Sequence, residues 1–144
     1  MILSDKTGAR LLLQIDGYYN DDGDWLRIHM EATTPRGAWE ATDSCLTMME
    51  AEQLIKWLRE IADDKVLDST LSFTEGHLEF KFWRRTEDVI QLSVYLGMEF
   101  SPPWFAEDHR TGQFPVDVSV SPSDVSNAAD QLEDERNKLQ TRGA

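Results

Sequence analysis

The sequence of 144 residues is short of cysteine and of long apolar runs, and both shortages narrow the class of protein. Because Cys45 is the only cysteine, no intramolecular disulfide can form, which suits a reducing compartment. No apolar run approaches the ~20 residues that a transmembrane helix needs, and no basic segment after Met1 leads into an apolar one. We therefore expect a cytoplasmic protein without a signal peptide or a membrane span.

Positive charge is also scarce. The chain carries 27 Asp and Glu residues against 14 Lys and Arg residues, a formal net charge of −13. Nucleic acids and anionic membranes are bound mainly through cationic side chains, so we expect neither as a partner. A basic protein would instead be attracted, and complementary fields accelerate association. The competing explanation of the acidic composition is solubility alone.

Catalytic and metal-binding patterns are missing as well. The sequence has no G-x-S-x-G, G-x-G-x-x-G, P-loop or H-E-x-x-H pattern. His29, His77 and His109 lie at no metal-ligand spacing from one another or from Cys45, which we expect to be a small buried residue. The acidic run 20–24 lacks the spacing of an EF-hand calcium loop and is typical of a turn. We therefore predict no active site, no metal and no cofactor.

Alternation of apolar and polar residues is the strongest structural signal that is present. It is nearly unbroken over residues 90–100, where every second residue is apolar. Shorter stretches with the same pattern predict further strands near residues 11–15, 25–31, 38–46, 77–83 and 114–120. We expect His29 and His77 on the polar sides of their strands. Strands with one apolar and one polar face are typical of antiparallel sheets that are covered on one side.

Two segments have the signals of a helix. Thr47 and Glu50 form a capping box, in which each side chain bonds the backbone N–H of the other. Ser121 and Pro122 are a capping serine and a proline suited to the first helical position. Stripes of apolar residues at helical spacing follow both starts, over residues 51–61 and 125–139.

These elements predict a single α+β domain that spans residues 1–144, a usual length for one domain. We expect an antiparallel sheet of about six strands with two helices packed on one face, in the order βββα-βββα.

The candidate partner contacts come from three parts of the chain. They are the acidic hairpin (Asp21, Asp22, Asp24), aromatic residues on the polar sides of strands (Trp25, Trp83, Tyr95) and the SPPW segment (Trp104, Glu107, Asp108). Large exposed aromatic side chains supply much of the binding energy at interfaces. Competing interpretations stay open: a loop or the N-terminal segment covers the rings, or the sheet curls into a partial barrel. Trp104 and Phe105 could also fold back to close one end of the core.

Several of these segments resemble the WapI family of immunity proteins. The most specific block is GAWEATD at 37–43, with Cys45 and Leu46 leading into the capped helix. The run 24–46, the helix EAEQLIKWLREIAD, the segment LSFTEGHLEF and the SPPW segment share the resemblance. It extends from the first expected strand to the sixth. Before the first hairpin the sequence has less aromatic and proline character than the family commonly shows.

The resemblance implies an antitoxin role. Such proteins are made in bacteria beside a polymorphic secreted toxin, often a nuclease, and neutralise it inside the producing cell or its kin. The resemblance implies a non-catalytic protein that occludes a cognate toxin, and the acidic composition adds the expectation that this toxin is basic. We expect a monomer or a weak homodimer. The alternatives are a cytoplasmic scaffold or oligomerisation domain, and a small hydrolase that uses carboxylates in a cleft.

Overall fold

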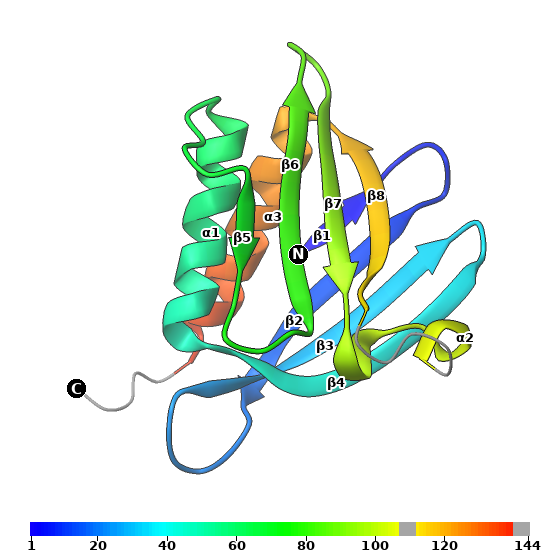
Figure 1. Cartoon of the computed structure of the whole chain (residues 1–144). Coiled ribbons are helices and arrows are strands. Elements are labelled where there is room, and N and C mark those ends of the chain that lie inside the picture. The colour runs from blue at the N-terminus through cyan, green and yellow to red at the C-terminus, as the bar shows by residue number, and fades with distance from the viewer. Residues whose placement is uncertain (107–111, 140–144) are drawn as a thin grey trace.

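The computed structural model describes residues 1–106 and 112–139 and contains two four-stranded antiparallel sheets (Figure 1). The first sheet has the strand order β1-β2-β3-β4 and the second β5-β6-β7-β8. The elements in chain order are β1 (Ile2–Ser4), β2 (Arg10–Tyr18), β3 (Trp25–Thr34), β4 (Gly37–Thr47), α1 (Met48–Ala62), β5 (Thr70–Ser72), β6 (Leu78–Arg85), β7 (Ile90–Leu96), the 3-10 helix η1 (Met98–Phe100), α2 (Pro103–Ala106), β8 (Phe114–Val120) and α3 (Pro122–Asn137).

The α+β class predicted from the sequence is confirmed, whereas the single six-stranded sheet with two helices is wrong. The described strands divide between two sheets, and β1 and β5 each add an edge strand to one of them. Each of these strands has only three residues, too few to show an alternating pattern. The short helices η1 and α2 were also missed. The observed order is four strands and a long helix, twice, with η1 and α2 between β7 and β8.

The two sheets cross each other, and α1 and α3 lie side by side along one side of them (Figure 1). In this view β5 to β8 pass in front of β1 to β4. α3 lies against β1 and β2, and α1 lies against β4. Alternate residues of the long strands point into the core, among them the buried Leu13, Ile28, Phe80 and Val94. The alternation of apolar and polar residues in the long strands therefore indicates which of their side chains face the core.

Both long helices begin at the residues that the sequence predicted. The hydroxyl of Thr47 accepts a hydrogen bond from the backbone N–H of Glu50 at 3.2 Å, and the Glu50 carboxylate accepts one from the N–H of Thr47 at 3.1 Å. Ser121 and Asp124 form the same reciprocal pair at the start of α3, with both distances 3.0 Å. Each capping box satisfies two backbone donors that the first turn leaves without an intrahelical partner.

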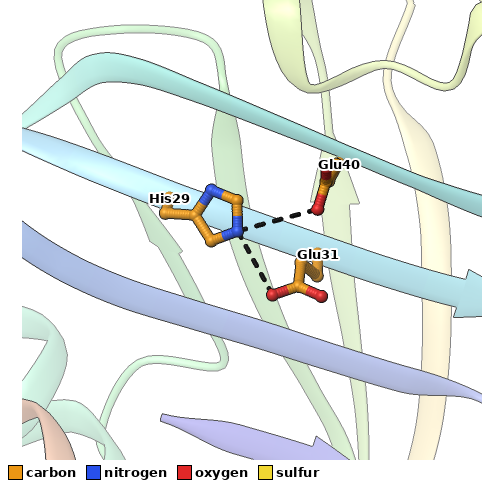
Figure 2. Close-up of side chains that lie close together, drawn as sticks. All are labelled: His29, Glu31 and Glu40. Carbon is orange, nitrogen blue, oxygen red and sulfur yellow. Dashed lines mark hydrogen bonds and ion pairs between the residues drawn. The ribbon is translucent and has the colours of Figure 1, made fainter.

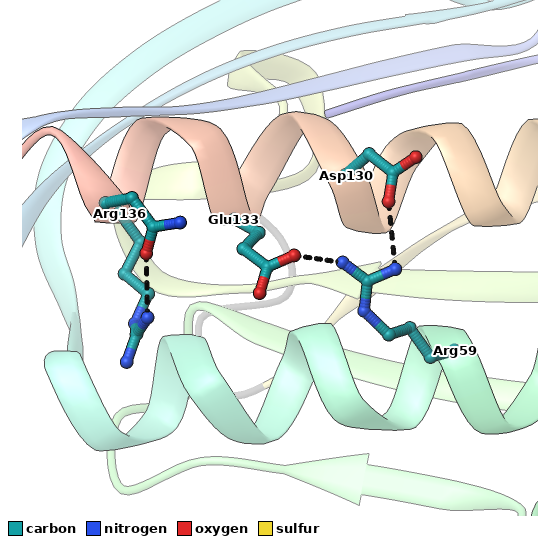
Figure 3. Close-up of polar contacts among 5 residues, drawn as sticks. Arg59, Asp130, Glu133 and Arg136 are labelled. Atoms are coloured by element: carbon teal, nitrogen blue, oxygen red, sulfur yellow. Dashed lines mark hydrogen bonds and ion pairs between the residues drawn. The ribbon is translucent and has the colours of Figure 1, made fainter.

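Ion pairs join α1 and α3, and Figure 3 shows the two that Arg59 forms. The Arg59 guanidinium, from α1, donates to Asp130 of α3 at 2.9 Å and also to Glu133. Arg136 of α3 donates in the opposite direction, to Glu52 of α1. The hydrogen bond to Asp130 and the charges of both carboxylates raise the pKa of Arg59, so this side chain stays charged. Because these side chains are partly exposed, each pair adds only about 0.2–1 kcal/mol of stability.

A bulge in β6 changes which residues face inward. Trp83 is the extra residue of this bulge, between the paired residues Phe82 and Arg84. Beyond the bulge the side chain of Arg85 faces inward, and Arg85 pairs with the buried Ile90 of β7. Its Nη1 donates to the carbonyl oxygens at the end of α1, at 2.6 Å and 2.8 Å, where a cation is favoured by the helix dipole.

The strand predicted over residues 90–100 ends early, at Leu96. Met98 has a φ of 52°, in the left-handed region, and begins the 3-10 helix η1. The Met98 side chain is therefore 55% exposed, although alternation predicted that it would face the core. Gly97 makes this turn possible, because a Cβ there would lie 2.5 Å from the carbonyl oxygen of Gly76.

Candidate partner-binding surface

The acidic turn, residues 20–24 between β2 and β3, carries the first group of predicted contacts. Three carboxylates are exposed there, as the sequence predicted for a turn: Asp21, Asp22 and Asp24. None of them forms an ion pair within residues 1–106 and 112–139. The backbone N–H of Met48 donates to the carbonyl oxygen of Asp24 at 2.9 Å, which ties the turn to the start of α1. The turn therefore presents unpaired negative charge from a fixed position.

Trp25 lies directly beside the acidic turn. It is the first residue of β3, it is half-buried, and it pairs across the sheet with Thr47. The acidic turn and Trp25 together form one patch at an end of the first sheet, with carboxylates at its tip and an aromatic ring at its base.

The other two predicted aromatic contacts share the outer face of the second sheet. Trp83 is 53% exposed, and its indole N–H donates to the Ser93 hydroxyl at 2.7 Å. Ser93 in turn donates to Asp117 on β8. The ammonium of Lys81 lies 3.8 Å from the centre of the Trp83 ring, at cation–π distance. Tyr95, on the same face as Ser93, is half-buried. Trp83 is therefore an exposed but well-oriented ring.

A groove of about 630 Å³ adjoins Trp83 on this face. Its polar lining includes Arg84, Asp117 and, from the β1–β2 turn, Asp5 and Thr7. Asp5 accepts a hydrogen bond from the backbone N–H of Ser119 at 3.1 Å, which joins that turn to β8. Burial by itself would raise the pKa of Asp5, but this bond and those from Thr7 and from the N–H of Ala9 outweigh burial, and its pKa is lowered.

Trp104 of α2 packs against the core. Its ring meets Trp39 edge-on, with 5.3 Å between ring centres, and Phe114 with 6.2 Å. Phe105 also contacts Phe114, at 5.6 Å. Both rings fold back to close one end of the core, which was one of the two interpretations that the sequence left open. A role of Trp104 in partner binding stays a prediction, and Glu107 and Asp108 lie outside the described residues.

The predicted contacts therefore do not form one surface. Figure 1 places the β2–β3 turn at the bottom of the view, the β6–β7 turn near Trp83 at the top, and α2 to the right. The acidic turn follows β2 in the first sheet, whereas Trp83 lies in β6 of the second, close to the β6–β7 turn. A partner that contacted both would have to extend over both sheets.

Sequence reasoning missed two clusters of histidine and carboxylate side chains: Asp43, His77 and Glu99, and His29, Glu31 and Glu40. His77 was expected on the polar side of a strand, either solvated or paired across strands, but it lies at the turn before β6 and is only 4% exposed. The signal for the second cluster was present, because the two-residue loop Pro35–Arg36 fixes the register that sets Glu40 opposite Glu31.

Two possible reactive groups have environments that oppose reactivity. Cys45 is buried at 1% exposure, as predicted, and burial together with nearby carboxylates raises the pKa of its thiol well above its usual value. Burial alone would raise the pKa of Asp43, but hydrogen bonds from His77 and from the N–H of Ser44 outweigh it, and the pKa is lowered. A carboxyl group with a lowered pKa remains ionised and is a poor general acid.

The described surface therefore carries unpaired carboxylates at one end of the first sheet and an exposed tryptophan on the outer face of the second. The chain belongs to the WapI-like immunity protein family, whose model, described as the Immunity protein WapI-like family, matches residues 1–140. Searches of curated proteins and of solved structures found no match. Within the described residues no helix is long and apolar enough to span a bilayer.

Proposed function

We propose that this protein binds a cognate secreted polymorphic toxin in the cytoplasm and neutralises it by occlusion, without catalysis. Membership of the WapI-like immunity protein family over residues 1–140 is the observation that carries the proposal. Inhibition by occlusion needs surface complementarity and no reactive group. The buried thiol of Cys45 and the ionised Asp43 are in keeping with that requirement.

The toxin is a basic protein, and a nuclease is the toxin class that fits best. A nuclease must bind a polyanion, so its active face carries cationic side chains. The net charge of −13 gives this protein the opposite field, which attracts such a face from a distance and speeds encounter. The same charge disfavours nucleic acid and anionic membranes as direct partners.

The acidic turn and the aromatic side chains have separate roles in this proposal. Asp21, Asp22 and Asp24 are exposed and unpaired within the described residues, so they steer the toxin toward the end of the first sheet. Trp25 lies next to them and becomes buried on binding. Trp83 and Tyr95 offer a second anchoring surface, and their contacts determine the rate of dissociation. Trp104, Glu107 and Asp108 are the remaining candidate contacts.

The scaffold alternative requires a self-complementary apolar sheet face. The outer face of the second sheet instead alternates Trp83 with polar and charged groups such as Lys81, Ser93 and Asp117. Such a face suits a polar interface with another protein better than a stable homodimer, so the protein acts as a monomer or a weak homodimer.

The test begins at the gene that neighbours the one encoding this protein. A large secreted protein with a variable C-terminal domain should be encoded there, and that C-terminal domain should arrest growth when it is expressed alone. Co-expression of this protein should restore growth, and the two purified proteins should form a 1:1 complex by size-exclusion chromatography. Failure to restore growth, or a toxin that stays active in the presence of excess protein, would exclude the proposal.

A further inference from the structure

Three ligand-type side chains meet on the outer face of the first sheet (Figure 2). His29 and Glu31 are two residues apart on β3, so they share a face, and Glu40 lies directly opposite Glu31 on β4. The Nε2 atom of His29 is 3.2 Å from the nearer Glu31 oxygen and 3.9 Å from the nearer Glu40 oxygen. Figure 2 shows both carboxylates directed at this one nitrogen.

The pairing of Glu31 with Glu40 is unfavourable without a cation. Like charges directly opposite each other on neighbouring strands repel, and nothing about a sheet requires two acids there. Arg27, the other residue of β3 on this face near His29, makes its ring contact with Tyr19 and not with these carboxylates. A positive ion between the two glutamates would convert the repulsion into attraction.

We infer that His29, Glu31 and Glu40 form a binding site for a divalent transition-metal ion of the zinc class. Its ligands are Nε2 of His29 and one carboxylate oxygen from each glutamate. Ligands about 2.0–2.1 Å from a tetrahedral ion lie roughly 3.3 Å apart, close to the 3.2 Å between His29 and Glu31. The Glu40 side chain is 68% exposed and has room to close the remaining gap. A water molecule takes the fourth position.

Thr42 supplies the support that a metal-binding histidine needs. It lies directly opposite His29 on β4, and its hydroxyl is 2.8 Å from Nδ1 of the ring. With an ion on Nε2 the proton must be on Nδ1, from which it is donated to Thr42. This bond fixes both the tautomer and the direction of the ring. All the groups involved project from paired strands, which hold a site more rigidly than loops do.

The Asp43–His77–Glu99 cluster has a different spacing and serves as the matched control. Nε2 of His77 lies 2.8 Å from an oxygen of each carboxylate, which is the length of a charge-assisted hydrogen bond. Nδ1 of His77 has no partner among the described residues. The 2.8 Å spacing is shorter than the separation of two ligands on a tetrahedral zinc ion, whereas the wider spacing around His29 fits such an ion.

The ligand set also selects the class of ion. Calcium prefers six to eight oxygen ligands and magnesium keeps several waters, and neither favours an imidazole nitrogen. One imidazole with two carboxylates suits zinc and its neighbours in the first transition row. The inference is independent of the proposed toxin-neutralising function.

The test is a titration of the chelator-treated full chain with Zn²⁺ by isothermal titration calorimetry. The parent protein should bind one ion at this site, and His29→Gln should weaken that binding at least tenfold. Thr42→Val, which keeps the shape but removes the hydroxyl, should weaken it by about tenfold to a hundredfold. His77→Gln should leave it unchanged. A His77→Gln, His109→Gln double variant, in which His29 is the only histidine, should still bind.

Two further measurements keep the inference falsifiable. At a zinc concentration about 100-fold above the dissociation constant, the melting temperature of the parent should rise by about 5 °C or more, and that of His29→Gln should not. Each variant must give the circular dichroism spectrum of the parent. Unchanged zinc affinity in His29→Gln, or loss of binding in His77→Gln with retention in His29→Gln, would overturn the assignment.

Discussion

The carboxylate of Glu50 accepts a hydrogen bond of 2.7 Å from the backbone N–H of Thr74, which lies 24 residues further along the chain. Its other oxygen closes the capping box with Thr47 at 3.1 Å. One side chain, only 8% exposed, therefore joins the start of α1 to the segment that leads into β6 and connects the two halves of the fold.

Replacement of Glu50 by alanine should lower the free energy of unfolding by about 2–3 kcal/mol. The change removes a helix cap and leaves the backbone N–H groups of Thr47 and Thr74, whose bonds to Glu50 are partly buried, without their charged acceptor. Urea denaturation followed by circular dichroism measures the loss. Glu52→Ala, two residues along α1, removes only the exposed pair with Arg136 and should cost less than about 1 kcal/mol. Equal losses in both variants would contradict the role of Glu50.

The lowered pKa of Asp5 predicts a stability that depends on pH. A carboxyl group whose pKa is lower in the folded state binds protons more weakly there than in the unfolded chain. The contribution of Asp5 to the free energy of unfolding is complete above the unfolded-state pKa of 3.8. It is lost as the pH falls through the pKa of the folded state. The difference in unfolding free energy between the parent and Asp5→Asn should be constant from pH 7 to about pH 5 and should shrink below about pH 4.

Thr7→Val tests the cause of that shift. The hydrogen bond from the Thr7 hydroxyl lowers the pKa of Asp5 more than any of the backbone hydrogen bonds does. Removal of this hydroxyl should therefore raise that pKa toward 3.8. An NMR titration of the Asp5 carboxyl carbon measures this directly. An identical titration curve in the parent and in Thr7→Val would show that the cause is wrongly assigned.

Neutralisation of the acidic turn should slow association with the toxin. If Asp21, Asp22 and Asp24 steer a basic partner, their joint change to asparagine should reduce the association rate by about tenfold at low ionic strength. It should also flatten the dependence of that rate on salt, with little change in dissociation. Stopped-flow fluorescence measures both rates.

A control for net charge is available elsewhere on the surface. Asp64, Asp68 and Asp134 are exposed, and their joint change to asparagine alters the net charge by the same three units. This control should reduce the association rate much less than the change in the acidic turn. Equal effects would mean that total charge, and not the acidic turn, controls encounter.

Substitution of Trp83 should mainly affect toxin binding, whereas substitution of Trp104 should mainly affect the stability of the fold. Trp83 is 53% exposed, so Trp83→Ala should change the unfolding free energy by less than about 1 kcal/mol. It should increase the dissociation rate of the toxin complex by tenfold or more if the outer face of the second sheet is the interface. Trp104→Ala removes contacts with Trp39 and Phe114 and should cost about 3 kcal/mol of stability. A dissociation rate unaffected by Trp83→Ala would remove that face from the interface.

Local chemistry made much of the fold predictable. The capping box at Thr47 and the capping serine Ser121 mark both long helices, because these side chains bond backbone donors that the first turn leaves without an intrahelical partner. Alternation located the long strands, because a half-covered sheet buries every second residue. The three-residue strands β1 and β5 gave no such signal, since their pairing depends on long neighbouring strands and not on their own composition.

The sequence by itself determined the acidic composition, the long elements and, where no bulge interrupts them, which side of the long strands is buried. These properties depend on residues that are close together in the chain. Tertiary structure decided the division into two sheets and the inward turn of Arg85 beyond the bulge at Trp83. Both depend on which strands pair and in what register, and a shift of a single residue moves a side chain to the opposite face of the sheet.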